Sequence, residues 1–520
     1  MKKLYTILAL VAAVVFGSCT NDLDQMPHVG TNAATVYSTI DGYKSVLAKI
    51  YGSYSLVGQE RANSNDLSSN KGQDLLRNLF YLQETATDEV ASTWLSGDNL
   101  TALTYMTWDA ADVWVADTYY RLYYSVALCN EFLRYCTPEA VSNFSEADKA
   151  LIATYAAEAR FIRALDYYFV LDLFRQGPYV NENTPTTGVI PEAYNGKQLY
   201  DFIASEIAEL ETLLPDSNYY GQADKASVWA LGVRLALNGE IYAGENHYSD
   251  CITYAKKILA TPHSLEGDYT KLFNADNNLR TNEIIFAFSA DADMATTWGS
   301  ATNIICSSIG NNSTQDPAKY GITNGWGSWR VRGELPALFE EADSRNLFWS
   351  DGQTQYFTDG ITNDSQGYYS EKWTNLTDNG EASSNSGERG CDTDYPLFRL
   401  AEVYLSAAEA VLRGGTGMSR SDALDLVNAV RVRAYGNDSG KISDAQFNLN
   451  FMIQERGREF YHEMLRRTDL VRFGQFTTAS YLWQWKGGVL DGKAVADRYN
   501  IYPIPLSEIS ANPNLKNENY

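Results

Sequence analysis

The side chains best suited to chemistry in this 520-residue sequence are aromatic rings. The chain holds 11 Trp and 36 Tyr, and aromatic residues make up 13% of it. A Trp or Tyr ring offers a flat apolar face together with a polar group. Sugars present apolar C–H patches between their hydroxyls and are a natural ligand for such rings. Tryptophans outside the helical patterns are therefore the first candidates for a binding site.

Several tryptophans meet this condition, and three of them are the binding candidates. Trp94 stands in a polar break after TDEVAST, and the amide of Asn99 can both donate to and accept from hydroxyls. Trp326 lies between two glycines in TNGWG, which we expect to leave it poorly buried, and Trp298 is a weaker third candidate. Each of them alone could equally be a core residue. Together, in loops from distant segments, they favour a binding site.

Two charged residues, Asp74 and Arg77, come just before the sequence LFYLQE. Charged groups form strong hydrogen bonds with polar ligands. We therefore expect both side chains at the rim of the same site.

Pairs of adjacent acidic residues make an enzymatic function an alternative to binding. Glycoside hydrolysis uses two carboxylates about 5 to 10 Å apart across a sugar cleft, and Asp88-Glu89 and Glu340-Glu341 are adjacent acidic pairs. Both pairs suit solvated faces or helix caps, and the sequence contains neither a G-x-S-x-G nor an H-E-x-x-H motif. Binding without catalysis is the preferred interpretation, and a pure protein-interaction scaffold is a third.

A structural calcium ion is a further hypothesis. Asp276, Asn278 and Asp438 lie in the segments FNADNN and GNDSG, and oxygen ligands from such loops suit Ca²⁺. Ordinary turn capping by Asx side chains is the alternative. No other cofactor is required. The five cysteines after Cys19 form no C-x-x-C pair, so we expect buried thiols rather than a zinc site or disulfides.

The charge balance argues against one class of partner. The chain has 41 Lys and Arg against 65 Asp and Glu, which gives a net charge of −24. The phosphates of a nucleic acid would be repelled by such a protein. A neutral or cationic ligand, or simple solubility at an exposed surface, is compatible with this charge.

Amphipathic runs predict helices separated by short breaks, and the most apolar of these helices occupies residues 145–174. Within it, Arg163 and Asp166, and likewise Asp172 and Arg175, are spaced to pair on a helix surface. Gly177 before Pro178 is expected to end this helix with a left-handed cap. Further helices are predicted at 36–54, 108–136, 197–214, 223–243, 248–259, 395–412, 420–434, 443–464 and 465–473.

Consecutive pairs of helices of this length suggest a tetratricopeptide-like array. Residues 261–394 differ, because Gly, Asn, Ser, Thr and Asp dominate and strand-like runs such as Glu283–Phe288 are short. We expect an inserted lobe whose loops carry the binding function. The alternating charges between Glu455 and Arg472 predict an ion-pair network that joins two helices.

Residues 1–18 predict a lipoprotein signal peptide. Lys2 and Lys3 precede an apolar run, Leu4–Phe16, which is too short to span a bilayer. Small residues then lead to Cys19, which would become the lipid-bearing N-terminus and carry palmitate or a similar acyl chain. An ordinary thiol after a cleaved secretory signal is the alternative.

Four segments, in order along the chain, resemble the SusD/RagB family of glycan-binding outer-membrane lipoproteins. They are EARFIRALDYYFVLDLFRQGPYV, YPLFRLAEVYLSAAEAVLR, QERGREFYHEMLRRTDLVRFGQF and IYPIPLSEISANPNLKNENY. The segments LQETATDEVASTW, DNLTALTYMTW and NGWG look most like starch-binding members. The resemblance marks Trp94 with Asn99 as a sugar platform and Trp326 as a second stacking residue. It adds slight support for a metal in the lobe.

The resemblance also implies a role. The protein would be lipid-anchored at the outer membrane, exposed at the cell surface, and would capture starch or malto-oligosaccharide without cutting it. It would deliver this α-glucan to a SusC-like TonB-dependent transporter; a different glycan is the alternative.

We therefore expect a mainly α-helical, tetratricopeptide-like superhelix with a loop-rich inserted lobe containing short strands. The expected regions are the signal peptide 1–18, an N-terminal helical region 19–260, the variable ligand lobe 261–394, and a C-terminal helical region and tail 395–520.

Overall fold

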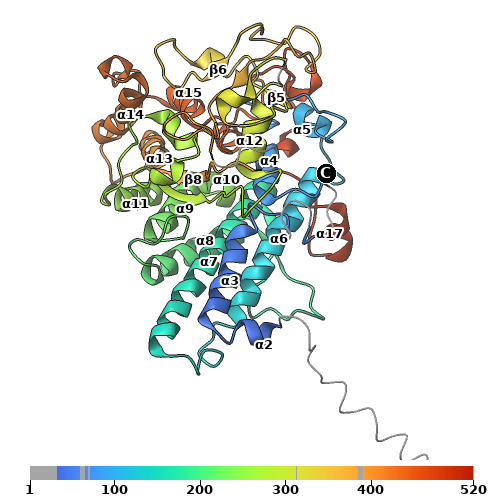
Figure 1. The fold of residues 1–520 in the computed structure, drawn as a ribbon, viewed down its shortest axis with the longest axis vertical. Coiled ribbons are helices and arrows are strands. Elements are labelled where there is room, and N and C mark those ends of the chain that lie inside the picture. Colours follow the sequence, from blue (N-terminus) through green and yellow to red (C-terminus); the bar gives the residue numbers. More distant parts are fainter. Residues whose placement is uncertain (1–31, 59–64, 68–70, 312, 384–389, 519) are drawn as a thin grey trace, which may run out of the picture. The chain divides into compact units, whose positions relative to one another are not determined.

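The computed structural model describes residues 32–58, 65–67, 71–311, 313–383, 390–518 and 520. The chain divides into two compact units, 1–46 and 47–520. The signal peptide and Cys19 lie outside the described residues, and the four expected regions stay a prediction. The structure is mainly helical with short two-stranded sheets, as expected (Figure 1).

The α-helices are α2 (Ala33–Val36), α3 (Ile40–Gly52), α4 (Leu75–Glu84), α5 (Thr101–Tyr105), α6 (Val113–Arg134), α7 (Glu146–Phe174), α8 (Gly196–Leu213), α9 (Lys225–Leu237), α10 (Gly239–Ala243), α11 (Tyr248–Leu259), α12 (Ser300–Ser308), α13 (Leu400–Leu412), α14 (Arg420–Tyr435), α15 (Leu449–Phe460), α16 (Arg466–Arg472) and α17 (Leu506–Ala511). The strands are β1 (Ala91–Ser92), β2 (Gln176–Pro178), β3 (Ala193–Asn195), β4 (Ile284–Phe288), β5 (Trp329–Arg330), β6 (Phe348–Trp349), β7 (Tyr369–Ser370) and β8 (Tyr395–Arg399).

Helices that follow one another in sequence also pack on one another. Helix α7 contacts α6 and α8, helix α9 contacts α8 and α11, and helix α13 contacts α11 and α14 (Figure 1). Each amphipathic helix thus buries its apolar face against a neighbour, as in a solenoid. Among the described residues no helix is both long and apolar enough to cross a membrane.

Helix α7 begins where its sequence predicts. The Ser145 hydroxyl accepts from the backbone N–H of Asp148, and acidic residues in the first turn favour the positive end of the helix dipole. Its end differs from the prediction, because Arg175 rather than Gly177 adopts the left-handed conformation, at φ 60°. Gly177 instead lies in β2, where a Cβ would approach the Tyr123 hydroxyl to 2.2 Å. A glycine is needed there for close packing.

The expected pairing of Arg163 with Asp166 is wrong. Arg163 contacts Glu182 at 2.5 Å and Glu206 at 3.6 Å, whereas the buried Asp166 accepts from the Tyr54 hydroxyl at 2.6 Å. Neighbouring elements supply these partners, so spacing within one helix could not identify them.

Other helix boundaries were only partly predicted. Residues 395–399 form strand β8, paired antiparallel with β4, and the helix predicted to start at 395 starts at 400. Partner strands override local helical periodicity there. The helix predicted at 36–54 is α3, which begins at Ile40 and ends at Gly52, and the helix predicted at 223–243 is divided into α9 and α10.

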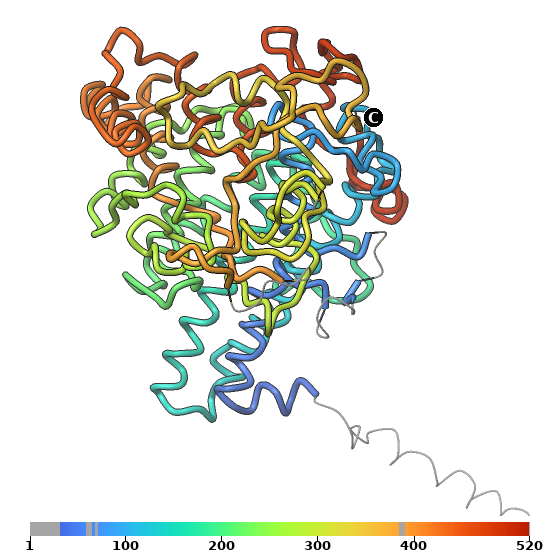
Figure 2. The backbone as a smooth tube through the Cα atoms, turned by 45° about the horizontal axis from the view of Figure 1, so that its top comes forward, coloured from blue at the N-terminus to red at the C-terminus, as the bar shows by residue number. Residues whose placement is uncertain are grey.

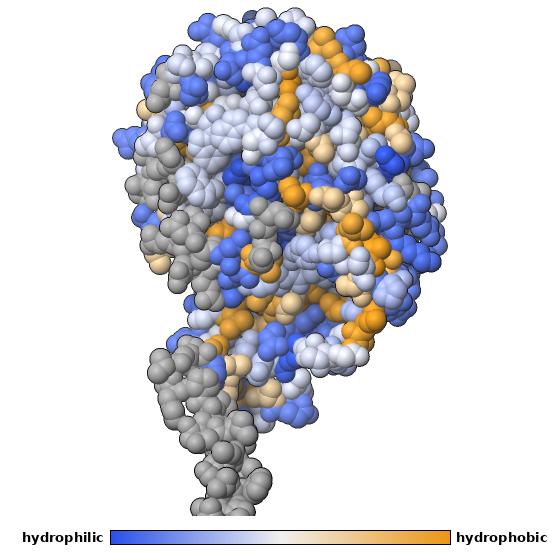
Figure 3. Space-filling view, turned by 90° about the vertical axis from the view of Figure 1, so that its right-hand side faces the viewer, coloured by the Kyte–Doolittle hydropathy of each residue, from blue (hydrophilic) through white to orange (hydrophobic). Residues whose placement is uncertain are grey.

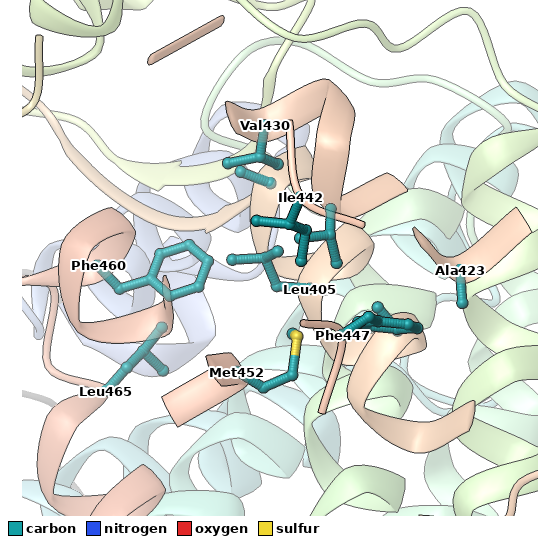
Figure 4. Packing of buried hydrophobic residues seen from close by; sticks show 11 residues of the cluster. Leu405, Ala423, Val430, Ile442, Phe447, Met452, Phe460 and Leu465 are labelled. Carbon is teal, nitrogen blue, oxygen red and sulfur yellow. The ribbon is translucent and has the colours of Figure 1, made fainter. Parts of the chain in front are cut away.

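Helices α13, α14 and α15 enclose one apolar core in the C-terminal region. Its buried residues include Leu405, Val430, Met452 and Phe460, which point toward one another from these helices (Figure 4). Ile442 and Phe447, from the connection between α14 and α15, complete it. This region is therefore a packed support for the segments that surround it.

Buried ion pairs tie this support to the loop-rich region, which confirms the predicted network and extends it. Arg399 contacts Glu283 at 3.0 Å, and Glu459 and Glu463 each at 2.6 Å. Arg345, from the loop-rich region, contacts Glu455 at 2.8 Å. Burial would raise the pKa of Glu459, but the surrounding Arg side chains lower it to about 2. The network fixes the helices through hydrogen-bonded charges.

Segments far apart in sequence meet beside this support. Strand β1 pairs with β5, and helix α4 contacts α12 and α16. Figure 2 shows the blue, yellow and red parts of the chain side by side here. On the face in Figure 3, hydrophobic residues form separate patches among hydrophilic ones.

Candidate functional site

The pairing of β1 with β5 brings Trp94 next to Trp326. Ser92 lies opposite Trp329 in this pair. The pairing continues past the strands, because Thr93 donates its N–H to the carbonyl of Ser328 at 2.8 Å. The two indole rings lie 6.4 Å apart between centroids, with planes 22° apart.

The C-terminal end of α12 holds Trp326 in place. The backbone N–H of Trp326 donates to the carbonyl of Cys306 at 2.6 Å, and Gly327 donates to Ile309 at 2.9 Å. A Cβ at Gly325 would lie 2.0 Å from the carbonyl oxygen of Gly310. The first glycine of TNGWG therefore permits close backbone approach, and Trp326 is half-buried rather than poorly buried.

Asp74 holds the third ring, Trp298, from the N-terminus of α4. The Asp74 carboxylate accepts from the backbone N–H of Arg77 at 2.9 Å as the helix cap. It also accepts from the Thr297 hydroxyl at 2.7 Å and from the Ser300 N–H at 3.3 Å. A Cβ at Gly299 would lie 1.5 Å from this carboxylate. Burial raises the pKa of Asp74.

Asp74 is therefore not at the rim, and that expectation is wrong. The side chain is fully buried and its acceptors are occupied by the protein's own donors. It positions the segment that carries Trp298, and the sequence could not separate this role from a contact with ligand.

Together the three rings form a continuous row. Trp326 is central, 5.9 Å between centroids from Trp298 with planes 47° apart. Trp94 is the most open of the three, with 42% of its surface exposed. The three indoles therefore place apolar ring surface from two distant segments at one site.

The Arg77 guanidinium contacts two residues of this row. Its guanidinium lies 5.9 Å from the centroid of Trp326 and donates to the carbonyl of Trp298 at 3.0 Å. It also pairs with Asp98 at 3.3 Å. With 6% of its surface exposed, Arg77 is buried, so its expected place at the rim is also wrong, and its contacts orient the indoles instead.

Asn99 lies at the open edge of the site. It is exposed and adopts the left-handed conformation at φ 59°, which Asn tolerates better than most residues. Its Oδ1 accepts from Lys71 Nζ at 3.2 Å, and Lys71 pairs with Asp98 at 3.0 Å. Sequence reasoning missed Lys71 and Asp98, because only the folded chain brings residues 71 and 98 together.

The acidic pairs do not form a catalytic site. Asp88 and Glu89 are buried rather than solvated, and Asp88 contacts Arg466 at 2.6 Å. Although burial opposes it, the Arg466 guanidinium lowers the pKa of Asp88. Glu340 and Glu341 are exposed, and Glu340 accepts from the Tyr435 hydroxyl at 3.0 Å.

The expected calcium ligands serve other contacts. Asp276 accepts from the backbone N–H of Asp378 at 2.7 Å, and Asp438 pairs with Lys441 at 2.9 Å. Asn278 lies in the short 3₁₀ turn Asn277–Leu279. The described part of the chain holds no group of three or more His, Cys, Asp or Glu side chains arranged for a metal ion. Calcium binding stays a prediction that these contacts do not support.

The cysteine prediction is confirmed for the described residues. Cys129, Cys251, Cys306 and Cys391 are buried, Cys136 is half-buried, and none of these five forms a disulfide. They behave as small apolar residues.

Sequence comparisons find several SusD-type proteins that are similar to this chain. The sequence model of the SusD family matches residues 337–520. The starch-binding protein SusD of Bacteroides thetaiotaomicron is 32% identical, with 100% of this chain and 99% of that protein covered. A SusD-like protein of Bacteroides ovatus is 23% identical, with 94% and 86% covered.

Solved structures share the fold. Surface glycan-binding protein A from Bacteroides thetaiotaomicron, in complex with laminarihexaose, matches with a TM-score of 0.69 at 21% identity, covering 92% of this chain and 99% of that one. A SusD superfamily protein from Parabacteroides distasonis matches with a TM-score of 0.70 at 20% identity and the same coverage.

Proposed function

Because this chain belongs to the SusD family of non-catalytic glycan-binding proteins, we propose that it binds starch or malto-oligosaccharide over the Trp94, Trp326 and Trp298 row. The row itself is the observation that carries the proposal. Three partly open indoles from separate loops lie in contact distance of one another. An aromatic row of this kind stacks on the apolar faces of successive sugars.

The choice of an α-glucan rests on the relative that matches the whole chain. The full-length 32% identity is to a starch-binding protein. The three rings, whose planes differ by 22° and by 47°, offer apolar faces that any glucan can contact, so the identity carries this choice.

The first test removes single rings. Trp94→Ala and Trp326→Ala should each weaken binding to starch and maltoheptaose by roughly 1 to 3 kcal/mol, because each removes an aromatic anchor. Isothermal titration calorimetry with maltoheptaose and retardation on starch gels measure the effect. Circular dichroism should show unchanged helix content.

Tyr219→Ala is the matched control, since Tyr219 is 83% exposed and lies in the loop between α8 and α9, away from the row's loops. It should bind as the parent does. If both Trp variants also bind as the parent does, the proposed placement is wrong.

A second candidate ligand is a β-glucan. The solved relative named above was crystallised with laminarihexaose, and its fold matches this one. Titration of the parent with laminarihexaose alongside maltoheptaose decides between them. Tighter binding of laminarihexaose would replace starch in the proposal while keeping the row as the site.

The cellular role follows from family membership. We propose that the protein is tethered at the cell surface by lipid on Cys19 and passes its glycan to a SusC-like TonB-dependent transporter of the outer membrane. Family membership supports both parts.

A further inference from the structure

A cavity lies beside Trp94, and neither Trp326 nor Trp298 lines it. It has a volume of about 610 Å³, a size within the usual range of ligand sites. Its wall combines the Trp94 ring with polar groups. The lining residues are Thr93, Trp94, Leu95, Ser96, Gly97, Asp98 and Thr362.

Thr362 belongs to a loop that is distant in sequence from Trp94 and is held by several hydrogen bonds. Arg330 of β5 is fully buried and donates to the carbonyls of Ile361 at 3.2 Å, Asn363 at 2.9 Å and Gln366 at 2.5 Å. The one carboxylate near it, Asp364, is 3.7 Å away and exposed. A buried charge is costly unless its donors are satisfied, and here backbone carbonyls of a single loop satisfy them.

The same strand pair carries both walls of the cavity. Arg330 lies opposite Ala91, three residues before Trp94. A small apolar cluster joins the two loops, since Ile361 and Phe357 pack with Ala91 and with Leu95. The loop that carries Thr362 is thus rigidly attached to the loop that carries Trp94.

The chemistry of the cavity suits a sugar. Ser96 and Thr362 carry hydroxyls at exposed positions, and hydroxyls can both donate and accept. The charge of Asp98 is already paired with Lys71 and Arg77, so the cavity offers a neutral polar wall next to an aromatic face.

We propose that this cavity is an additional sugar-binding subsite, filled by the part of a longer glucan that runs past Trp94. The inference rests on the proposed function of the tryptophan row. It assigns Thr362 and Ser96 to ligand contact and makes affinity depend on chain length beyond the three rings.

A blocking variant tests the subsite without straining the fold. Gly97 lines the cavity and a Cβ there would meet nothing within 4 Å, so Gly97→Leu adds bulk at the cavity wall without a clash. Gly267→Leu is the matched control, because a Cβ at Gly267 also meets nothing within 4 Å and Gly267 lies outside the cavity. Thr362→Val removes one hydroxyl at nearly constant size.

Affinities for a short and a long ligand are then compared by calorimetry, with maltotriose against maltoheptaose and laminaritriose against laminarihexaose. Gly97→Leu and Thr362→Val should weaken the long ligand by about 3- to 10-fold, the range of one or two lost hydrogen bonds. The short ligand should keep its affinity, and Gly267→Leu should change neither.

Two results overturn the subsite. One is an unchanged affinity for the long ligand in both variants, and the other is an equal loss of affinity for short and long ligands. Failure of the proposed function looks different, since Trp326→Ala would then leave both ligands bound as tightly as in the parent.

Discussion

At the scale of single residues, Asp74 shows how a buried carboxylate can shape a site that it does not touch. It caps α4 and fixes the segment before α12, which carries Trp298. Asp74→Ala should lower the free energy of unfolding by about 2 to 3 kcal/mol, because buried donors lose their acceptor. Asp74→Asn keeps one acceptor oxygen and should cost about 1 kcal/mol or less. Urea unfolding measures both, and equal losses would contradict this role.

At the scale of elements, two buried acids join helix α4 and the residues just after it to the turn between α15 and α16. Glu84 accepts from the Met464 N–H at 2.6 Å, and Glu89 accepts from the His462 N–H at 2.8 Å. Burial raises the pKa of Glu84 from 4.5 to about 7. Burial, and then the neighbouring Glu84, also raise the pKa of Glu89. The folded junction therefore holds a proton that the unfolded chain releases.

This junction predicts a pH-dependent difference between Glu84→Gln and the parent. Between pH 4.5 and 7 the folded parent binds more protons than the unfolded chain, so the Glu84 contribution to stability falls as pH rises. Gln mimics the protonated acid and has no such loss. Relative to the parent, the free energy of unfolding of the variant should rise by on the order of 1 to 3 kcal/mol between pH 5 and pH 8, as measured by urea unfolding. A difference that stays constant with pH would contradict the shared proton.

At the scale of the whole molecule, the net charge of −24 and the expected lipid on Cys19 are the two features that bear on the location of the protein. Cys19→Ala should move the protein from the membrane fraction to the soluble fraction, because one modified cysteine would carry the anchor. Fractionation with labelled palmitate measures both position and acylation. The variant must be expressed without the transporter, since binding to that partner could retain it; retention in the membrane fraction without the partner would refute the anchor.

Sequence periodicity and capping residues were sufficient to identify the long helices, since their causes are local. The start of α7 at Ser145 and the whole of α11 (Tyr248–Leu259) needed nothing beyond neighbours within a few residues. The ordered family segments likewise indicated the family that full-length relatives support. Composition and motif types directed attention to Trp94, Trp298 and Trp326.

Only the tertiary structure decided how those tryptophans meet and what supports them. Thr93 and Ser328, whose pairing aligns the row, are 235 residues apart, and no local pattern encodes such a contact. The same holds for the partner of Arg163, for the buried role of Asp74, and for the loop that Arg330 binds and that lines one cavity with Trp94. Helices follow from interactions within a few residues, whereas the site follows from hydrogen bonds and burial between segments that only the folded chain brings together.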